Sequence, residues 1–253
     1  MTCKVAHRVS SALLLGTAIG LPLSACSGGE IASTGTPLTQ QEREQGAKAH
    51  PELVAEFGGA ETGARADYVA SVTRNVAVHS GLSTAPADFN VTLLNSSVNN
   101  AFAVPGGYVY VTRQLVSLMN NEAELAGVMG HEVGHVAARH SAKRQAKAQQ
   151  NALLGVLGQV LSGVVLGNSA LGQLGQKIAS TAPQLATLSY SRKQELKADN
   201  LGIQYLGAAG YDPRAMGTVL QNLAAQNSLD AQLQGRNAQV PEWASTHPDP
   251  ASR

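Results

Sequence analysis

The sequence predicts an α+β fold that is mainly helical and contains one small mixed sheet. Apolar residues recur at helical spacing in stretches of the chain after Gln40, as Val69, Val72 and Val76 do. One short region instead alternates apolar and polar residues, and a Pro-Gly-Gly turn follows it. Helical stretches around one short β region indicate an α+β domain.

Residues 1–25 are expected to be a lipoprotein signal peptide. Lys4 and Arg8 give it a positive start, and the apolar run at 11–21 is too short to span a bilayer. The sequence Leu-Ser-Ala-Cys that ends at Cys26 resembles a bacterial lipobox, whose cysteine is lipidated and becomes the first mature residue. An ordinary secretory signal and an uncleaved anchor are the alternatives.

Residues 26–40 are expected to form a flexible tether, because they are small, polar and rich in glycine. Residues 41–253 are long enough for one well-packed domain. Cys26 is the only cysteine outside the signal, which excludes an intramolecular disulfide and a Cys-rich zinc site. Removing Lys4 and Arg8 leaves 16 of the 18 basic residues of the chain against 17 acidic ones. The mature protein is therefore close to neutral, which argues against nucleic acid as a partner.

The first structural elements of the domain are expected to be a helix, a strand and a hairpin. The helix covers 61–80 and is broken by Pro86, and the strand at 89–93 alternates apolar and polar residues as a half-buried strand does. The hairpin covers 100–112, and Pro105 assigns its first strand to a sheet edge, since proline donates no ladder hydrogen bond. Such an edge can hold an extended peptide, or it can be purely structural.

The next helix starts at a cap formed by Asn121 and Glu124 and carries the sequence His131-Glu-Val-Gly-His135. Two histidines four residues apart lie about 40° from each other around a helix axis, so both can reach one metal ion. Glu132 lies beside the first histidine, where it can take a proton from a bound water. This H-E-x-x-H pattern is typical of zinc metallopeptidases, and the alternative is a helix with two surface histidines.

That helix is expected to continue past His140 and through the basic stretch 143–147, read as a solvated face or, alternatively, as a contact for anionic lipid. His140 should lie about 140° from His135 and should not reach the same metal. The apolar segment 152–167 is too short to span a membrane comfortably and is expected to be buried or to cover the active site. A transmembrane helix is the alternative for this segment.

A catalytic zinc site needs a third protein ligand, for which Glu195 is the best candidate. Leu196, Leu201, Ile203 and Leu206 support a helix here that ends near Gly207 or Gly210. Asp199 follows Glu195 by one turn, so it can hold the outer nitrogen of a ligating histidine.

The chain resembles the thermolysin-like gluzincin metallopeptidases. The resemblance rests on HEVGH, on Ser-Arg before the downstream Glu-Leu-Lys-Ala-Asp, on Asn-Ala-Phe-Ala-Val-Pro-Gly-Gly upstream and on Ser-Thr-His-Pro near residue 247. It is strongest to the bacterial family that includes HtpX, BepA and LoiP, and the lipobox and length resemble LoiP most. It implies a zincin-like domain whose edge strand borders a single zinc ion.

The same resemblance implies a role for each matching residue. The zinc ligands would be His131, His135 and Glu195, the general base Glu132, and the carboxylate behind a ligand Asp199. The substrate-binding edge strand would include Asn100, Ala101 and Phe102. His247 matches a histidine that either stabilises the oxyanion or occupies the open zinc position at rest.

The function that follows is a zinc-dependent metalloendopeptidase acting on misfolded proteins of the bacterial cell envelope. Ser27 after Cys26 favours a lipoprotein of the outer membrane that faces the periplasm, by resemblance to Gram-negative sorting rules. The alternatives are a zinc-containing chaperone or adaptor that binds unfolded proteins without cleaving them, and an intramembrane peptidase that uses the segment 152–167.

Overall fold

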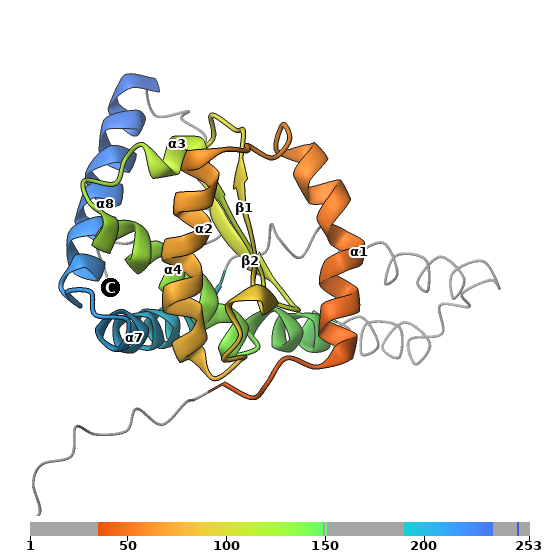
Figure 1. Cartoon of the computed structure of the whole chain (residues 1–253). Coiled ribbons are helices and arrows are strands. Elements are labelled where there is room, and N and C mark those ends of the chain that lie inside the picture. Colours follow the sequence, from red (N-terminus) through yellow and green to blue (C-terminus); the bar gives the residue numbers. More distant parts are fainter. Residues whose placement is uncertain (1–34, 149, 151–189, 235–246, 248–253) are drawn as a thin grey trace, which may run out of the picture. The chain divides into compact units, whose positions relative to one another are not determined.

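The computed structural model describes residues 35–148, 150, 190–234 and 247. The predicted signal peptide, Cys26, most of the tether and the segment 152–167 lie outside the described residues. The described helices and strands, shown in Figure 1, are α1 (Gln40–Glu56), α2 (Ala64–Ala77), β1 (Asn90–Leu94), β2 (Ala101–Val104), β3 (Tyr108–Thr112), α3 (Arg113–Val116), α4 (Glu122–Ala137), α7 (Arg192–Ala208) and α8 (Ala215–Gln234). The prediction of a mainly helical α+β fold with a small mixed sheet is confirmed.

The sheet has the strand order β1-β3-β2, with β1 parallel and β2 antiparallel to β3. The hairpin between β2 and β3 turns at Gly106 and Gly107, whose φ angles of 92° and 84° are readily adopted only by glycine. As predicted from Pro105, β2 is an edge strand of this sheet.

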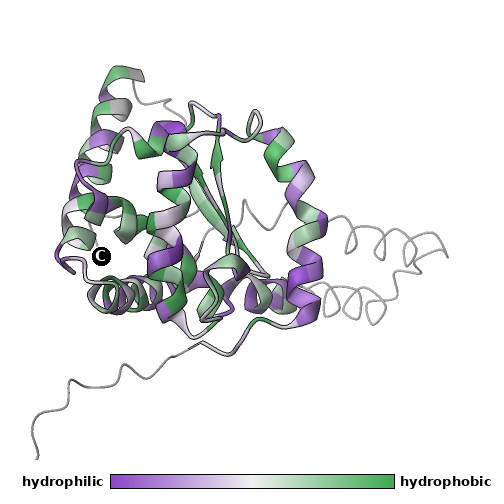
Figure 2. Cartoon of the chain, in the orientation of Figure 1, coloured by the Kyte–Doolittle hydropathy of each residue, from purple (hydrophilic) through white to green (hydrophobic). Residues whose placement is uncertain are grey.

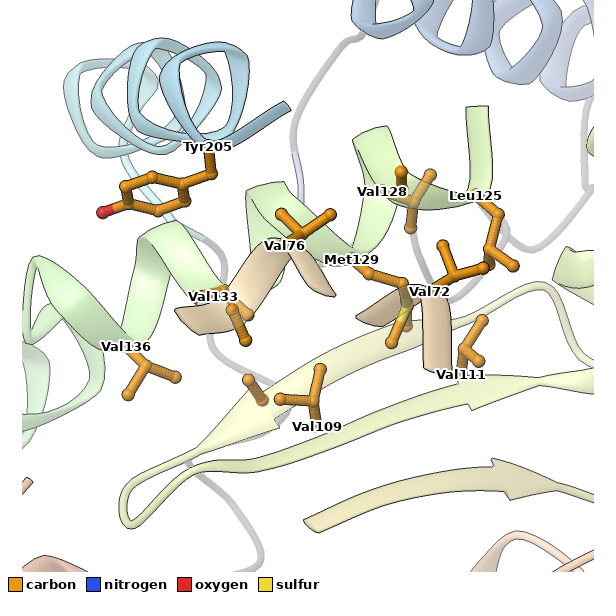
Figure 3. Close-up of a cluster of buried hydrophobic side chains, with 14 of the residues drawn as sticks. Val72, Val76, Val109, Val111, Leu125, Val128, Met129, Val133, Val136 and Tyr205 are labelled. Carbon is orange, nitrogen blue, oxygen red and sulfur yellow. The ribbon is translucent and has the colours of Figure 1, made fainter. Parts of the chain in front are cut away.

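Alternate residues of each strand point to opposite faces of the sheet, and both faces are covered by helices. Val109 and Val111 of β3 join the main core with residues of α2 and α4 (Figure 3). Tyr110, between them, joins a second cluster with Leu53 of α1 and Phe57. The strands are largely hydrophobic, whereas α1 mixes hydrophilic and hydrophobic residues along its length, as expected for a helix with one face in water (Figure 2).

This two-sided cover explains one wrong expectation about β1. The alternation in its sequence predicted a half-buried strand, yet Thr92, Leu93 and Leu94 are all buried. Leu93 belongs to the main core and Leu94 to the α1 cluster, so neither face of the strand is left to solvent at this end.

Helix α4 lies at the centre of the fold and is buried from Glu124 to its end. Its first turn is capped by the side chain of Asn121, which accepts a hydrogen bond from the backbone N–H of Glu124, as predicted. It packs against α2, α7, α8 and β2. The contact with α7 is close because Gly134 lacks a side chain: a Cβ there would lie 2.9 Å from the carbonyl oxygen of Ala198.

The predicted continuation of this helix past His140 is wrong. Helix α4 ends at Ala137, and Arg139 adopts a left-handed φ of 54° before a new helical segment begins at 140. The Arg139 side chain forms an ion pair with Glu42 and donates hydrogen bonds to the carbonyl oxygens of Thr36 and Pro37. These interactions offset the cost of the strained backbone. The N-terminal end of the described chain is thereby attached to the end of α4.

Helix α2 ends at Ala77 and is followed by a 3-10 turn at Val78–Ser80, before the predicted break at Pro86. Gly81, with a left-handed φ of 77°, ends this turn. Among the described residues, no helix is both long and apolar enough to cross a membrane.

Candidate metal centre

Four buried side chains bring their ligand atoms together where α4 meets α7: His131, His135, Glu195 and His247. His131 and His135 lie one turn apart on α4, and their Nε2 atoms are 2.9 Å from each other. The Oε1 atom of Glu195 on α7 lies 3.3 Å from Nε2 of His135, and Oε2 lies 3.6 Å from Nε2 of His131. The structure therefore brings together the three residues predicted to ligate zinc.

Helix α7 presents Glu195 in this position because its start is well defined. The Ser191 side chain caps the helix by accepting from the backbone N–H of Gln194, and the Gln194 side chain accepts from the backbone N–H of Ser191. Counting from that cap, Glu195 and Asp199 fall on the buried face of the helix together with Gly202. The predicted end is confirmed, since Gly210 follows the helix with a φ of 85°.

His247 completes the group through its Nδ1 atom. This atom lies 3.2 Å from Nε2 of His131 and 3.2 Å from both carboxylate oxygens of Glu195. Of the two positions expected for this histidine, the geometry favours the one in which it takes the fourth place around a metal.

The spacing and the chemistry of these four donors fit zinc. Ligand atoms about 2.0–2.1 Å from a tetrahedral zinc ion lie about 3.3–3.4 Å from one another. The separations listed above, 2.9–3.6 Å, scatter around that value. Imidazole nitrogen and carboxylate oxygen are both common zinc ligands, and several lone pairs converging in a buried space need a cation between them.

The outer ring nitrogen of each of the two α4 histidines also has a partner. Nδ1 of His131 lies 2.8 Å from the Oδ1 atom of Asp199, the residue predicted for this place. Nδ1 of His135 lies 2.9 Å from Nδ1 of His140, which was predicted only not to reach the same metal. His140 does not join the donor group, but the break after α4 turns its ring back against His135.

Burial disfavours charge throughout this site. It lowers the pKa of His135 well below its usual value, with His131 adding to the effect. Burial, together with Lys143, Lys197 and Arg144, lowers the pKa of His140 to about 4, so this ring is neutral at neutral pH. Burial raises the pKa of Asp199 to about 7, against an opposing effect of His247.

Glu132, the predicted general base, is buried beside the donor group without being part of it. Its Oε1 atom lies 3.4 Å from Nε2 of His247, on the side of that ring opposite the donor atom Nδ1. A carboxylate in this place can exchange a proton with a small molecule that enters the fourth position.

Tyr190 is a site residue that the sequence analysis did not identify. Its ring lies 3.8 Å from the ring of His135, centroid to centroid, and Arg144 places its guanidinium 3.7 Å over the same tyrosine. Arg144 is therefore half-buried in the site, which corrects the prediction that the whole stretch 143–147 is a solvated face. Its place directly before Ser191, the cap of the helix that carries Glu195, is the sequence feature from which Tyr190 could have been predicted to lie near the site.

The predicted substrate-binding residues lie along β2, which packs against α4. Ala101 points into the core on the α4 side, whereas Phe102 points to the opposite face and packs against Phe57 and Tyr110. Only the main chain of Phe102 is therefore available to a ligand on the α4 side. The buried amide oxygen of Asn100 has no hydrogen-bond partner in the described part of the chain.

With this geometry established, comparison with known proteins identifies the family. Residues 63–253 match peptidase family M48. The chain belongs to this family. Peptidases of family M48 are zinc-dependent, in agreement with the donor group described above.

Several known proteases are similar to this chain. The beta-barrel assembly-enhancing protease of Escherichia coli K12 is 33% identical over 189 residues, which are 74% of this chain and 37% of the relative. The protein of the same name from Yersinia pestis is 36% identical over 168 residues, 65% of this chain and 33% of the relative. The mitochondrial metalloendopeptidase OMA1 of Bos taurus is 29% identical over 164 residues, 64% and 30% respectively. The matched region is about a third of the length of these relatives.

Proposed function

We propose that this protein is a zinc metalloendopeptidase that hydrolyses internal peptide bonds. The observation that carries the proposal is the buried donor group of His131, His135, Glu195 and His247, with the carboxylate of Glu132 next to it. Membership of family M48 supports the same reaction class.

In this proposal, the metal ligands are His131, His135 and Glu195, and about one zinc ion is held per chain. These residues would hold a zinc ion whose chemistry would be that of a Lewis acid toward the scissile carbonyl and the attacking water. Glu132 accepts the proton of that water and later donates it to the leaving amine. Asp199 holds His131 with its Nε2 lone pair directed to the metal, because the carboxylate accepts the proton of Nδ1.

His247 has two possible roles, and the position of its Nδ1 atom supports the second. As an oxyanion donor it would act only during the reaction, whereas as a fourth ligand it closes the site at rest. We propose that it closes the site in the described state, so that substrate must displace this ring. The resting protein would then be a peptidase of low activity.

Substrate binding is proposed for the edge strand. β2 has β3 as its only strand neighbour in the described part of the sheet, so its other edge can pair with an extended polypeptide. The buried amide oxygen of Asn100, at the start of β2, can accept a hydrogen bond from the substrate main chain.

The cellular setting is proposed from the sequence. Cys26 would be lipidated after removal of residues 1–25 and would attach the protein to the outer membrane, facing the periplasm, as in a LoiP-like lipoprotein. The substrates would be misfolded envelope proteins. Relatives named beta-barrel assembly-enhancing protease are compatible with this setting.

A zinc-containing chaperone or adaptor is the second candidate, and the four-donor group is the observation that favours it. Structural zinc sites are usually closed by four protein ligands, as this group would be with His247 in place. Such a protein would bind unfolded polypeptides without cleaving them.

Metal analysis combined with casein cleavage distinguishes the two candidates. The peptidase should contain about one zinc per chain and should lose cleavage with a chelator. Glu132→Gln should keep the zinc and lose cleavage, because Glu132 is a base and not a ligand. A Glu132→Gln protein that cleaves casein at the wild-type rate would disprove the assignment. Because His247 is proposed to close the resting site, a zinc-loaded protein that does not cleave casein even as His247→Ala would favour the chaperone.

A further inference from the structure

His140 is a buried histidine next to the metal centre that the proposed mechanism does not use. It is 2% exposed, and its Nδ1 atom lies 2.9 Å from Nδ1 of His135. On a continuous helix, a residue five positions after His135 would lie about 140° away around the axis. The left-handed backbone at Arg139 breaks that helix and allows the ring of His140 to reach His135.

The orientation of His135 determines which of its nitrogens carries the proton. Nε2 faces the donor group, 2.9 Å from Nε2 of His131 and 3.3 Å from Glu195. A metal ligand must offer a lone pair, so Nε2 is unprotonated and the single proton of the neutral ring is on Nδ1. That N–H points at His140, which must therefore accept it with its own Nδ1 and carry its proton on Nε2.

The two ligating histidines of α4 are thus oriented by partners of different charge. Nδ1 of His131 donates to the carboxylate of Asp199, whereas Nδ1 of His135 donates to an imidazole. The outer nitrogen of a metal-binding histidine usually donates to a carboxylate, a backbone carbonyl or water. A neutral imidazole also accepts the Nδ1 hydrogen bond, but it adds no negative charge beside Glu195 and Glu132.

The contact of Tyr190 with His135 complements this hydrogen bond. The two ring centroids are 3.8 Å apart with the rings tilted by 33°, and the guanidinium of Arg144 lies over the tyrosine ring. This contact limits the movement of the His135 ring, but it cannot select the tautomer, since packing of a ring face does not distinguish the two ring nitrogens.

We propose that His140 is a positioning residue that holds His135 in its Nδ1–H tautomer and thereby increases the affinity of the site for zinc without touching the metal. The proposal rests on the proposed function only in that His131, His135 and Glu195 bind zinc.

A matched pair of variants at this position tests the proposal. Asparagine places its amide oxygen at the place in the side chain where histidine has Nδ1, so His140→Asn keeps an acceptor. His140→Leu is similar in size and has none. The readouts are the zinc dissociation constant, measured by competition with a chromophoric chelator, and the visible absorption spectrum of the cobalt-substituted protein.

His140→Leu should weaken zinc binding about 10–100-fold and change the cobalt spectrum, and His140→Asn should stay within a few-fold of wild type. Equal zinc affinities for the two variants, whether both tight or both weak, would overturn the proposal. Thermal unfolding of the zinc-free proteins identifies a variant that has simply lost its fold. If the wild-type protein binds no stoichiometric zinc, it is the proposed function that fails.

Discussion

His247 lies in the corner of the donor group that a catalytic zinc site leaves to water. Its Nδ1 atom is as close to Glu195 and His131 as a fourth ligand would be, and its Nε2 atom faces Glu132. A single side chain therefore separates a closed, four-ligand centre from an open one with three ligands. Replacing His247 is therefore the substitution that distinguishes the two arrangements most directly.

Under the closed-site proposal, His247→Ala should keep zinc and should cleave casein faster than wild type. The three other ligands remain, and the fourth position becomes accessible to water and substrate. Initial cleavage rates at equal zinc loading measure the effect. A fall in turnover of about 10²–10³-fold would instead assign the oxyanion role to His247.

At the scale of residues, the sequence predicts the metal centre well and its surroundings poorly. The two histidines of HEVGH follow from helical spacing, and Glu195 and Asp199 follow from their one-turn spacing only when HEVGH is taken into account. The structure brings all four together. His140 and Tyr190 could not be placed, because their positions depend on a backbone break at Arg139 and on tertiary packing. Local spacing carries no information about either.

The packed pair of helices α4 and α7 carries most of the site: His131, Glu132 and His135 lie on α4, and Glu195 and Asp199 lie on α7. Their backbones approach closely at Gly134 and Gly202. The helix predicted from Leu196, Leu201, Ile203 and Leu206 is present, but Leu196 and Ile203 are 40% and 37% exposed. Leu201 and Leu206 are buried together with Glu195 and Asp199, so the apolar pattern identifies the helix but only part of its buried face.

Adding one methyl group to this helix contact should destabilise the fold. In Gly134→Ala the new Cβ would meet the carbonyl oxygen of Ala198 at 2.9 Å, and backbone atoms cannot move away as a side chain can. We expect a loss of about 1–3 kcal/mol in the free energy of unfolding. Urea denaturation, followed by circular dichroism, measures it.

Gly217→Ala in α8 is the matched control, because a Cβ there has no neighbour within 4 Å. Alanine is the better helix former, so this variant should be unchanged or more stable by up to about 1 kcal/mol. Equal stability of the two variants would show that α4 and α7 are not held together as closely as the structure indicates.

At the scale of the molecule, the donor group joins distant parts of the chain. The residues lie on α4, on α7 and at position 247, so His131 and His247 are 116 residues apart. A metal ion that binds only the folded protein stabilises it by mass action. The metal centre should therefore act as a cross-link of the tertiary structure as well as a reaction site.

Removal of zinc should lower the melting temperature of the whole domain. At a free zinc concentration 100-fold above the dissociation constant, binding contributes about 2.7 kcal/mol to stability. Differential scanning calorimetry with and without a chelator measures the shift. A His131→Ala/Glu195→Ala double variant, which keeps only two of the four donors, should melt at the chelated temperature under both conditions. A wild-type protein insensitive to the chelator would contradict a metal bound in this place.

The contacts of Arg139 with Thr36, Pro37 and Glu42 bear on how far the domain can extend from a membrane to which the chain is anchored. The described chain therefore begins beside the end of α4. If Cys26 is the lipidated residue, about ten residues connect the bilayer to this point, and they extend to roughly 35 Å at most. The length of this tether, together with its point of attachment beside α4, then limits how far from the membrane surface a polypeptide can be cut.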